Sequence, residues 1–174
     1  MTMKATLLAC CLFLAALPAS RGALIGFAAD NVAIQTSHAT YSAGKADTLD
    51  VRFEVTDQWS FIRFVPKADG WDLSAFESIE VVVTNTGNTT TRMALRVDQA
   101  GPTKSEFRNT SSMQTIAPGV SVTITVRFGL DYNKITPIDT SKIGAIHIFI
   151  AKNQTEPSAL TISSIKGVPL PWAP

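Results

Sequence analysis

Cysteine is scarce in this sequence: among 174 residues only Cys10 and Cys11 occur. Both lie in an N-terminal stretch where Lys4 precedes the apolar run ATLLACCLFLAALPA and small residues follow. This layout is typical of a secretory signal peptide, and we predict that residues 1–22 form one. The exported remainder then has no disulfide, although it enters an oxidising compartment, and it depends on its packed core for stability. We expect the protein to be secreted or periplasmic.

The sequence also lacks a clear excess of either positive or negative charge. Lys4 and Arg21 lie in the leader, so 13 of the 15 basic residues remain against 14 acidic ones. Without a strongly basic patch, nucleic acid and anionic membranes are poor partners. We therefore predict no nucleic-acid partner and no membrane association after signal cleavage. A neutral or weakly charged polysaccharide is compatible with this balance.

Motifs of catalysis and of metal binding are missing as well. The chain has no HExxH, Cys–His pair, GxSxG or glycine-rich phosphate loop, and its two histidines are His38 and His147. His147 stands between two isoleucines of a predicted strand, and we interpret it as an ordinary surface histidine. The 14 acidic residues include chance pairs, but nothing marks one as a glycosidase dyad. No dense acidic calcium loop occurs. We predict that the protein by itself is not an enzyme, with no catalytic residue, cofactor or metal ligand assigned.

Alternating apolar and polar residues are what the sequence does contain. Period-two patterns, typical of half-buried strands, occur at 48–55, 79–84, 92–98, 120–128, 145–151 and 159–165. No stretch has a helical period. We predict an all-β fold, an antiparallel β-sandwich of the jelly-roll type over residues 23–168, followed by a Pro-rich tail at 169–174. The predicted core residues are Ile79, Val81, Val83, Leu95, Val97, Val122, Ile124, Val126, Ile146, Ile148 and Ile150.

Two segments between strands carry specific turn chemistry. Ala117-Pro118-Gly119 suits a type II turn, because proline fixes one central φ and glycine supplies a positive φ at the next. In GWDLSAF, we expect Trp71 to be a core residue rather than an exposed platform. Asp72 and Ser74 are then expected to bond local backbone groups.

Three segments in order resemble one family. They are WDLSAFESIEVVVTNTGNTTTRMALRVDQAG, TIAPGVSVTITVRFG and IDTSKIGAIHIFIAKNQTEPSALTISSIKGV. Together they resemble the non-catalytic, carbohydrate-binding-module-like domain of β-agarases and related secreted glycoside hydrolases. The resemblance implies a galactose-binding-like jelly roll that binds a polysaccharide or oligosaccharide, such as an agar-type galactan, and that associates with a glycoside hydrolase.

The sequence departs from that family at two places. Ser163 stands where relatives often have an aspartate, which weakens an inherited structural calcium site. No catalytic barrel follows the closing VPLPWAP, so the chain is expected to be a free-standing module or a fragment of a longer enzyme. The alternatives are a purely structural or protein-interaction domain and, less favoured, a small glycan hydrolase or lyase.

The predicted ligand site uses one aromatic and several polar side chains. Because the sequence lacks a row of exposed tryptophans and tyrosines, soluble chains are favoured over crystal surfaces as targets. We predict that Trp59 stacks on a sugar while hydroxyls bond to Arg63, Arg96, Asp98 and Asn109. The alternative is that Arg96 and Asp98 simply pair at a strand end. Phe149 shares the outward phase of His147, and we favour a strand covered on both sides over a ligand platform there.

Overall fold

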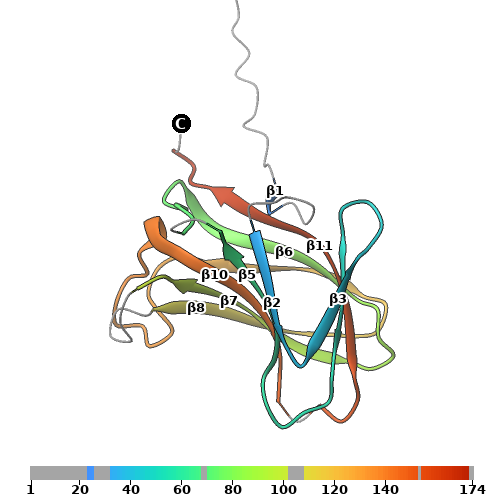
Figure 1. Cartoon of the computed structure of the whole chain (residues 1–174). Coiled ribbons are helices and arrows are strands. Elements are labelled where there is room, and N and C mark those ends of the chain that lie inside the picture. Colours follow the sequence, from blue (N-terminus) through green and yellow to red (C-terminus); the bar gives the residue numbers. More distant parts are fainter. Residues whose placement is uncertain (1–22, 26–31, 68–69, 102–107, 153, 173–174) are drawn as a thin grey trace, which may run out of the picture.

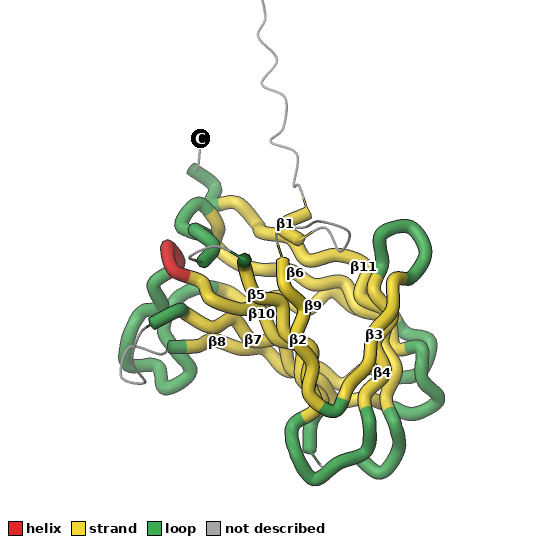
Figure 2. Tube along the Cα trace, in the orientation of Figure 1, coloured by secondary structure: helices red, strands yellow, loops and turns green. Residues whose placement is uncertain are grey.

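The computed structural model describes residues 23–25, 32–67, 70–101, 108–152 and 154–172, and the predicted signal peptide lies outside these. Two antiparallel sheets face each other (Figures 1 and 2). In the first sheet the order is β3 (Ala39–Ala43), β4 (Leu49–Phe53), β11 (Ser158–Pro169), β6 (Phe76–Asn85) and β9 (Ser121–Arg127), and β1 (Ala23–Ile25) also pairs with β11. In the second sheet the order is β2 (Val32–Ser37), β5 (Ser60–Pro66), β10 (Ile143–Ile150), β7 (Thr91–Gln99) and β8 (Asn109–Ile116).

This architecture confirms the predicted all-β, jelly-roll sandwich. Among the described residues the helical structure is one 3-10 turn, Thr140–Lys142, which the side chain of Asp139 caps by accepting from the Ser141 N–H. No described helix has the length and apolar character needed to cross a membrane. Neighbours in each sheet are mostly distant in sequence, so the fold depends on long-range pairing between the strands.

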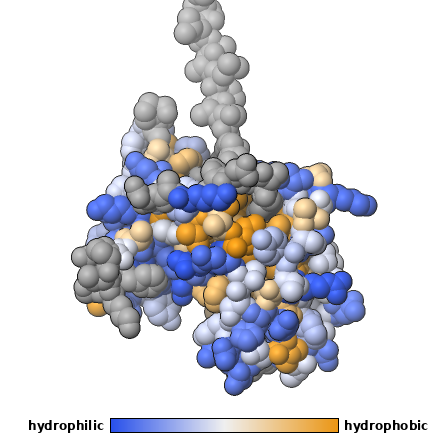
Figure 3. All heavy atoms as spheres, viewed as in Figure 1, coloured by the Kyte–Doolittle hydropathy of each residue, from blue (hydrophilic) through white to orange (hydrophobic). Residues whose placement is uncertain are grey.

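The core lies between the sheets, and it contains the predicted residues. Because alternate side chains of a strand point to opposite faces, strands such as β4 and β5 contribute every second residue to this core. Ten of the eleven predicted core residues are at most 3% exposed, and the other, Val122, is partly buried against them. Hydrophobic residues gather between the sheets, whereas the rest of the visible surface is mainly hydrophilic (Figure 3).

The predicted turn chemistry is confirmed at Ala117–Val120 and, in the other segment, for Asp72. At Ala117–Val120 the N–H of Val120 donates to the carbonyl of Ala117 over 3.2 Å, and Gly119 has the positive φ of 73° that a type II turn requires. In the other segment the carboxylate of Asp72 accepts from the backbone N–H of Ser74 at 3.0 Å. Trp71 is half-buried, packs against the core and bridges to Ile143 through two backbone hydrogen bonds. It is therefore a structural residue, as predicted.

Candidate functional site

The outer face of the second sheet carries an unusual set of side chains. On β10 the inward residues Ile146 and Ile148 fill the core, so His147 and Phe149 point away from it. The strand register places Arg63 of β5 and Arg96 of β7 on either side of His147. It likewise places Phe61 and Ala94 on either side of Phe149.

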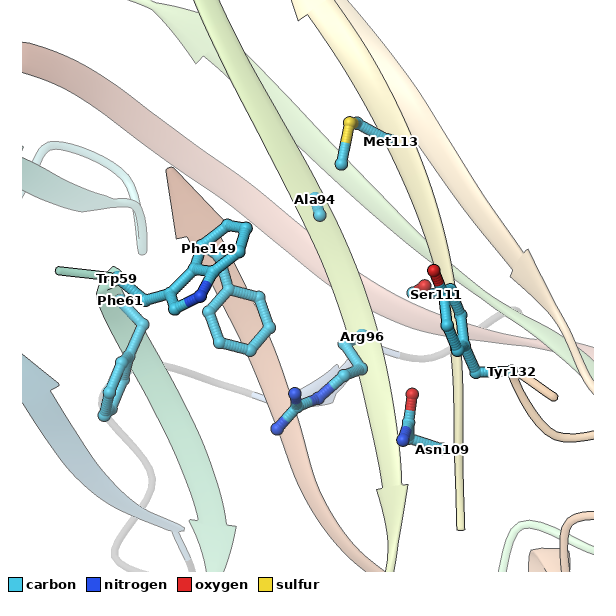
Figure 4. A pocket seen from close by; sticks show the side chains of 9 residues that line it. All are labelled: Trp59, Phe61, Ala94, Arg96, Asn109, Ser111, Met113, Tyr132 and Phe149. Atoms are coloured by element: carbon cyan, nitrogen blue, oxygen red, sulfur yellow. The ribbon is translucent and has the colours of Figure 1, made fainter. Parts of the chain in front are cut away.

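Four of these side chains, those of Phe61, Ala94, Arg96 and Phe149, border a surface hollow of about 510 Å³, which we call the aromatic cleft. Trp59, Phe61 and Phe149 lie on one side, Tyr132 and Ser111 lie on the other, and Ala94 and Arg96 come from the strand between them (Figure 4). The residues that line the cleft are Trp59, Phe61, Ala94, Arg96, Asn109, Ser111, Met113, Tyr132 and Phe149. Such a concave, mostly apolar surface with a few polar groups is the usual form of a small-ligand site.

The aromatic wall is built by edge-to-face packing. The ring centroid of Phe149 lies 6.0 Å from those of both Trp59 and Phe61, with interplanar angles of 68° and 69°. Such T-shaped contacts are the preferred geometry of aromatic pairs and hold the rings in place. Trp59 nevertheless keeps 46% of its surface exposed. A half-exposed ring that packs against Phe149 is suited to stack against the C–H face of a sugar.

Tyr132 is held on the opposite wall by its loop. Its backbone N–H donates to the carbonyl of Asn109 on β8 at 2.6 Å. The preceding residue, Asp131, is buried and accepts from the N–H groups of Ile135 and Thr136 at 3.1 and 3.3 Å. The Tyr132 side chain is 71% exposed even though its backbone is anchored. The loop therefore presents a second open aromatic ring to the cleft.

Beside the cleft, Arg96, Asp98 and His147 form a charged cluster. The guanidinium of Arg96 contacts both carboxylate oxygens of Asp98, at 2.7 and 2.9 Å. The Nε2 of His147 lies 2.7 Å from Asp98 Oδ2, and its ring stacks on Phe149 with centroids 5.1 Å apart. Arg96 also lies 4.6 Å above the Phe149 ring. The carboxylate thus fixes the orientation of Arg96 at the cleft.

Burial and charge set the protonation of this cluster. Burial raises the pKa of Asp98, but the hydrogen bond and charge of His147, followed by those of Arg96, outweigh it and hold that pKa below 3.8. Burial lowers the pKa of the His147 imidazole below 6.5, the charges of Arg96 and Arg63 lower it further, and Asp98 opposes them only in part. At neutral pH His147 is therefore uncharged and donates from Nε2 to the ionised Asp98.

We predict that mild acid destabilises the protein through His147. Between its folded pKa and 6.5, the unfolded chain binds a proton that the folded protein does not, so the free energy of unfolding falls as the pH is lowered from 6.5. Asp98 adds a further loss as the pH falls from 3.8 through its lowered folded pKa. Urea unfolding of wild type and His147→Gln at pH 7.5 and 5.5 tests the histidine contribution. The wild type should lose more stability than the variant over this interval, and equal losses would contradict the assignment.

The five predicted site residues lie on this face in three positions. Trp59, Arg96 and Asn109 line the aromatic cleft. Asp98 lies behind Arg96 and is 3% exposed, so it holds the guanidinium rather than facing the cleft. Arg63 lies across His147 from Arg96, with its Nη1 3.5 Å from Oε1 of Gln35, and does not line the cleft.

Two interpretations from the sequence are wrong. His147 is not a surface histidine, because the surrounding arginine, phenylalanine and aspartate side chains leave it only 5% exposed. The strand of Phe149 is not covered on both sides by other strands, because this ring is part of the cleft wall on the outer face. In both cases the outward side chains of β5, β7 and β10 pack on one another. They shield His147 and, in part, Phe149 from water although no further sheet of the described residues lies over this face.

Tyr132 and Phe61 belong to the cleft but were missed in the sequence. Phe61 alternates in phase with Arg63, which is the signal that it points outward. Tyr132 lies in GLDYNKITP, whose polar and turn residues show no alternating strand pattern. The sequence therefore gives no signal for the position of this ring. Among the described residues no group of three or more His, Cys, Asp or Glu side chains gathers to hold a metal ion. Ser163, at the expected carboxylate position, is exposed.

Comparison with known proteins identifies similar folds in solved structures. No family model and no curated protein matches the chain. The agarase AgWH50C matches 84% of the chain with 14% identity and a TM-score of 0.66, but this covers only 24% of the agarase. An exo-β-agarase matches 86% of the chain with 17% identity and a TM-score of 0.65. The chain therefore spans about a quarter of the length of these enzymes.

A carbohydrate-binding module matches over nearly its whole length. The family 11 module from Clostridium thermocellum, solved with a β-1,3-1,4-mixed-linked tetrasaccharide, has 16% identity and a TM-score of 0.61. The match covers 84% of this chain and 94% of the module. The chain thus has the β-sandwich fold that carbohydrate-binding modules share with a domain of agarases.

Proposed function

We propose that the protein is a secreted, non-catalytic module that binds single polysaccharide chains in the aromatic cleft. The observation that carries this proposal is the pair of open rings, Trp59 and Tyr132, on opposite walls of the cleft (Figure 4). Aromatic faces on both sides suit a chain that enters between them, whereas a flat crystal surface would need the rings in one plane. Arg96 and Asn109 provide hydrogen-bond donors to sugar hydroxyls.

A second hollow of about 490 Å³ adjoins the aromatic cleft. Tyr132 and Ser111 border both hollows, and Thr110 and Lys134 line the far one. We therefore propose that a ligand longer than one or two sugars extends from the cleft past Tyr132 to this second hollow. The neutral or weakly charged galactans of agar are the first ligands to test, because agarases are among the structures with this fold.

Affinity electrophoresis in gels that contain agarose, carrageenan, xylan or mixed-linkage β-glucan tests the proposal. We expect at least one galactan to retard the wild type, without release of reducing ends or unsaturated products during long incubation. Retardation by none of these glycans would contradict carbohydrate binding and favour a structural or protein-interaction domain. Sustained turnover that one carboxylate substitution abolishes would contradict the non-catalytic assignment.

A further inference from the structure

The two sheets differ in the charges that their strands carry. The strands of the first sheet contain three cations, Arg52, Arg127 and Lys166, and three carboxylates, Asp50, Glu77 and Glu80. The strands of the second sheet contain Arg63, Arg92 and Arg96 but a single carboxylate, Asp98. The strands of the first sheet are therefore balanced in charge, whereas those of the second sheet carry two more cations than carboxylates.

The one carboxylate of this sheet is already engaged. Asp98 is 3% exposed and holds Arg96 in a two-point contact while it accepts from His147. Because His147 is neutral, the cluster of these three groups has no net charge at pH 7. Arg63 and Arg92 therefore remain as the uncompensated charges of the sheet.

The described partners of these two arginines are uncharged. Arg63 reaches the amide oxygen of Gln35 at 3.5 Å, and its Nε is buried without a hydrogen-bond acceptor among the described residues. The Nε of Arg92 lies 2.9 Å from the thioether sulfur of Met113, a residue that lines the cleft. A thioether is a weak acceptor and carries no charge. Guanidinium groups are matched in geometry and charge by carboxylate, phosphate and similar oxyanions, which these contacts do not supply.

A third cation, Lys152, lies near the cleft. The Nζ of Lys152 lies 5.6 Å from the centroid of the Trp59 ring, at the aromatic wall of the cleft. The described part of the chain places no carboxylate within ion-pair distance of Arg63, Arg92 or Lys152. Unpaired cations thus lie near the cleft, while its walls are apolar.

We infer that the natural ligand is an anionic polysaccharide, a chain whose sugars bear sulfate or carboxylate groups at intervals. This inference rests on the proposed function. Among the neutral and weakly charged polysaccharides considered there, it selects the charged ones. The apolar rings bind the sugar faces, and the anionic substituents meet the cations on the outer face of the sheet.

Two matched pairs of glycans test this inference. One pair is κ-carrageenan and the same material after chemical desulfation, and the other is polygalacturonate and its methyl ester. We expect the wild type to bind at least one charged member about tenfold more tightly than its uncharged counterpart, with the preference reduced by salt. The pair that shows the preference identifies sulfate or carboxylate as the recognised group.

Three variants assign the preference to this face. The double variant Arg63→Gln/Arg92→Gln should lose most of the preference, measured as the ratio of the two affinities. Arg127→Gln, an exposed arginine of the other sheet, should retain it. Trp59→Ala should weaken binding to both members of the pair. Circular dichroism and urea unfolding check that each variant is folded.

The outcomes separate the inference from the proposed function. Binding of neutral and charged members with equal affinity overturns the inference and leaves the proposed function intact. A preference that survives Arg63→Gln/Arg92→Gln, or that Arg127→Gln removes equally, also overturns it. Failure to bind any glycan overturns the proposed function and the inference together.

Discussion

A protein that carries both Trp59→Ala and Tyr132→Ala is expected to bind its glycan about thirtyfold more weakly than the wild type, a loss of about 2 kcal/mol. The two rings stand on opposite walls of the aromatic cleft with 46% and 71% of their surfaces exposed. Each loses contact with water when a sugar stacks on it, and alanine offers no face for this contact. Exposed aromatic residues of this kind commonly dominate the energy of a binding surface.

The matched control is Trp172→Ala. Trp172 is 76% exposed and does not line the cleft, so its removal should leave affinity unchanged. Isothermal titration calorimetry with the glycan that retards the wild type gives the affinities. Tyr132 and Trp172 are mostly exposed, so their substitution should leave the urea midpoint close to that of the wild type. Trp59→Ala also loses the edge-to-face contact with Phe149, so circular dichroism checks that the double variant is folded before its affinity is measured. Equal affinities of the double variant and the Trp172 variant would remove the aromatic cleft from the binding site.

The largest expected loss of stability comes from Asn85→Asp, at about 3 kcal/mol or more. Asn85 is fully buried at the end of β6. Its amide nitrogen donates to the carbonyls of Thr89 and Ile116 at 2.8 and 2.9 Å, and its oxygen accepts from the N–H of Gly87 at 3.0 Å. Aspartate keeps the acceptor but places an ionised oxygen against two carbonyl oxygens, where no donor compensates it.

Asn88→Asp is the control for this variant. It makes the same chemical change three residues later, at an exposed position, so it should change stability by less than about 0.5 kcal/mol. Urea unfolding followed by far-UV circular dichroism compares the two. If Asn85→Asp unfolds at the same urea concentration as Asn88→Asp, the amide network does not hold the ends of β6 and β8 together.

The sequence predicts the fold better than it predicts the site. Alternation in β6, β7, β9 and β10 identifies both the strands and their buried faces, because the core requires one face of each strand to be apolar. The same alternation places Arg63 and Arg96 outside the core. It does not give the order β2-β5-β10-β7-β8, which depends on pairing between distant segments. Which outward residues become neighbours is therefore unknown from sequence alone.

The error at His147 and the omission of Tyr132 both follow from this gap. His147 is expected to be exposed if only its own strand is considered, but Arg63 and Arg96 arrive from strands far away in sequence and cover it. Tyr132 enters the site through a loop whose position depends on the carbonyl of Asn109 and on the buried carboxylate of Asp131. No periodic pattern reports such contacts. Alternation predicts which side chains of a strand face the core, but not how neighbouring strands or a loop surround the outward ones.

The central claim is that a glycan binds in the aromatic cleft, and the indole N–H signals of the three tryptophans test it most directly. In a ¹⁵N-labelled protein titrated with oligosaccharides from agarose and from κ-carrageenan, substitution assigns the signals of Trp59, Trp71 and Trp172. We expect the Trp59 signal to shift and saturate while those of Trp71, packed against the core, and of Trp172, in the C-terminal segment, stay in place. A titration in which the oligosaccharide binds and the Trp59 signal does not move would contradict the claim.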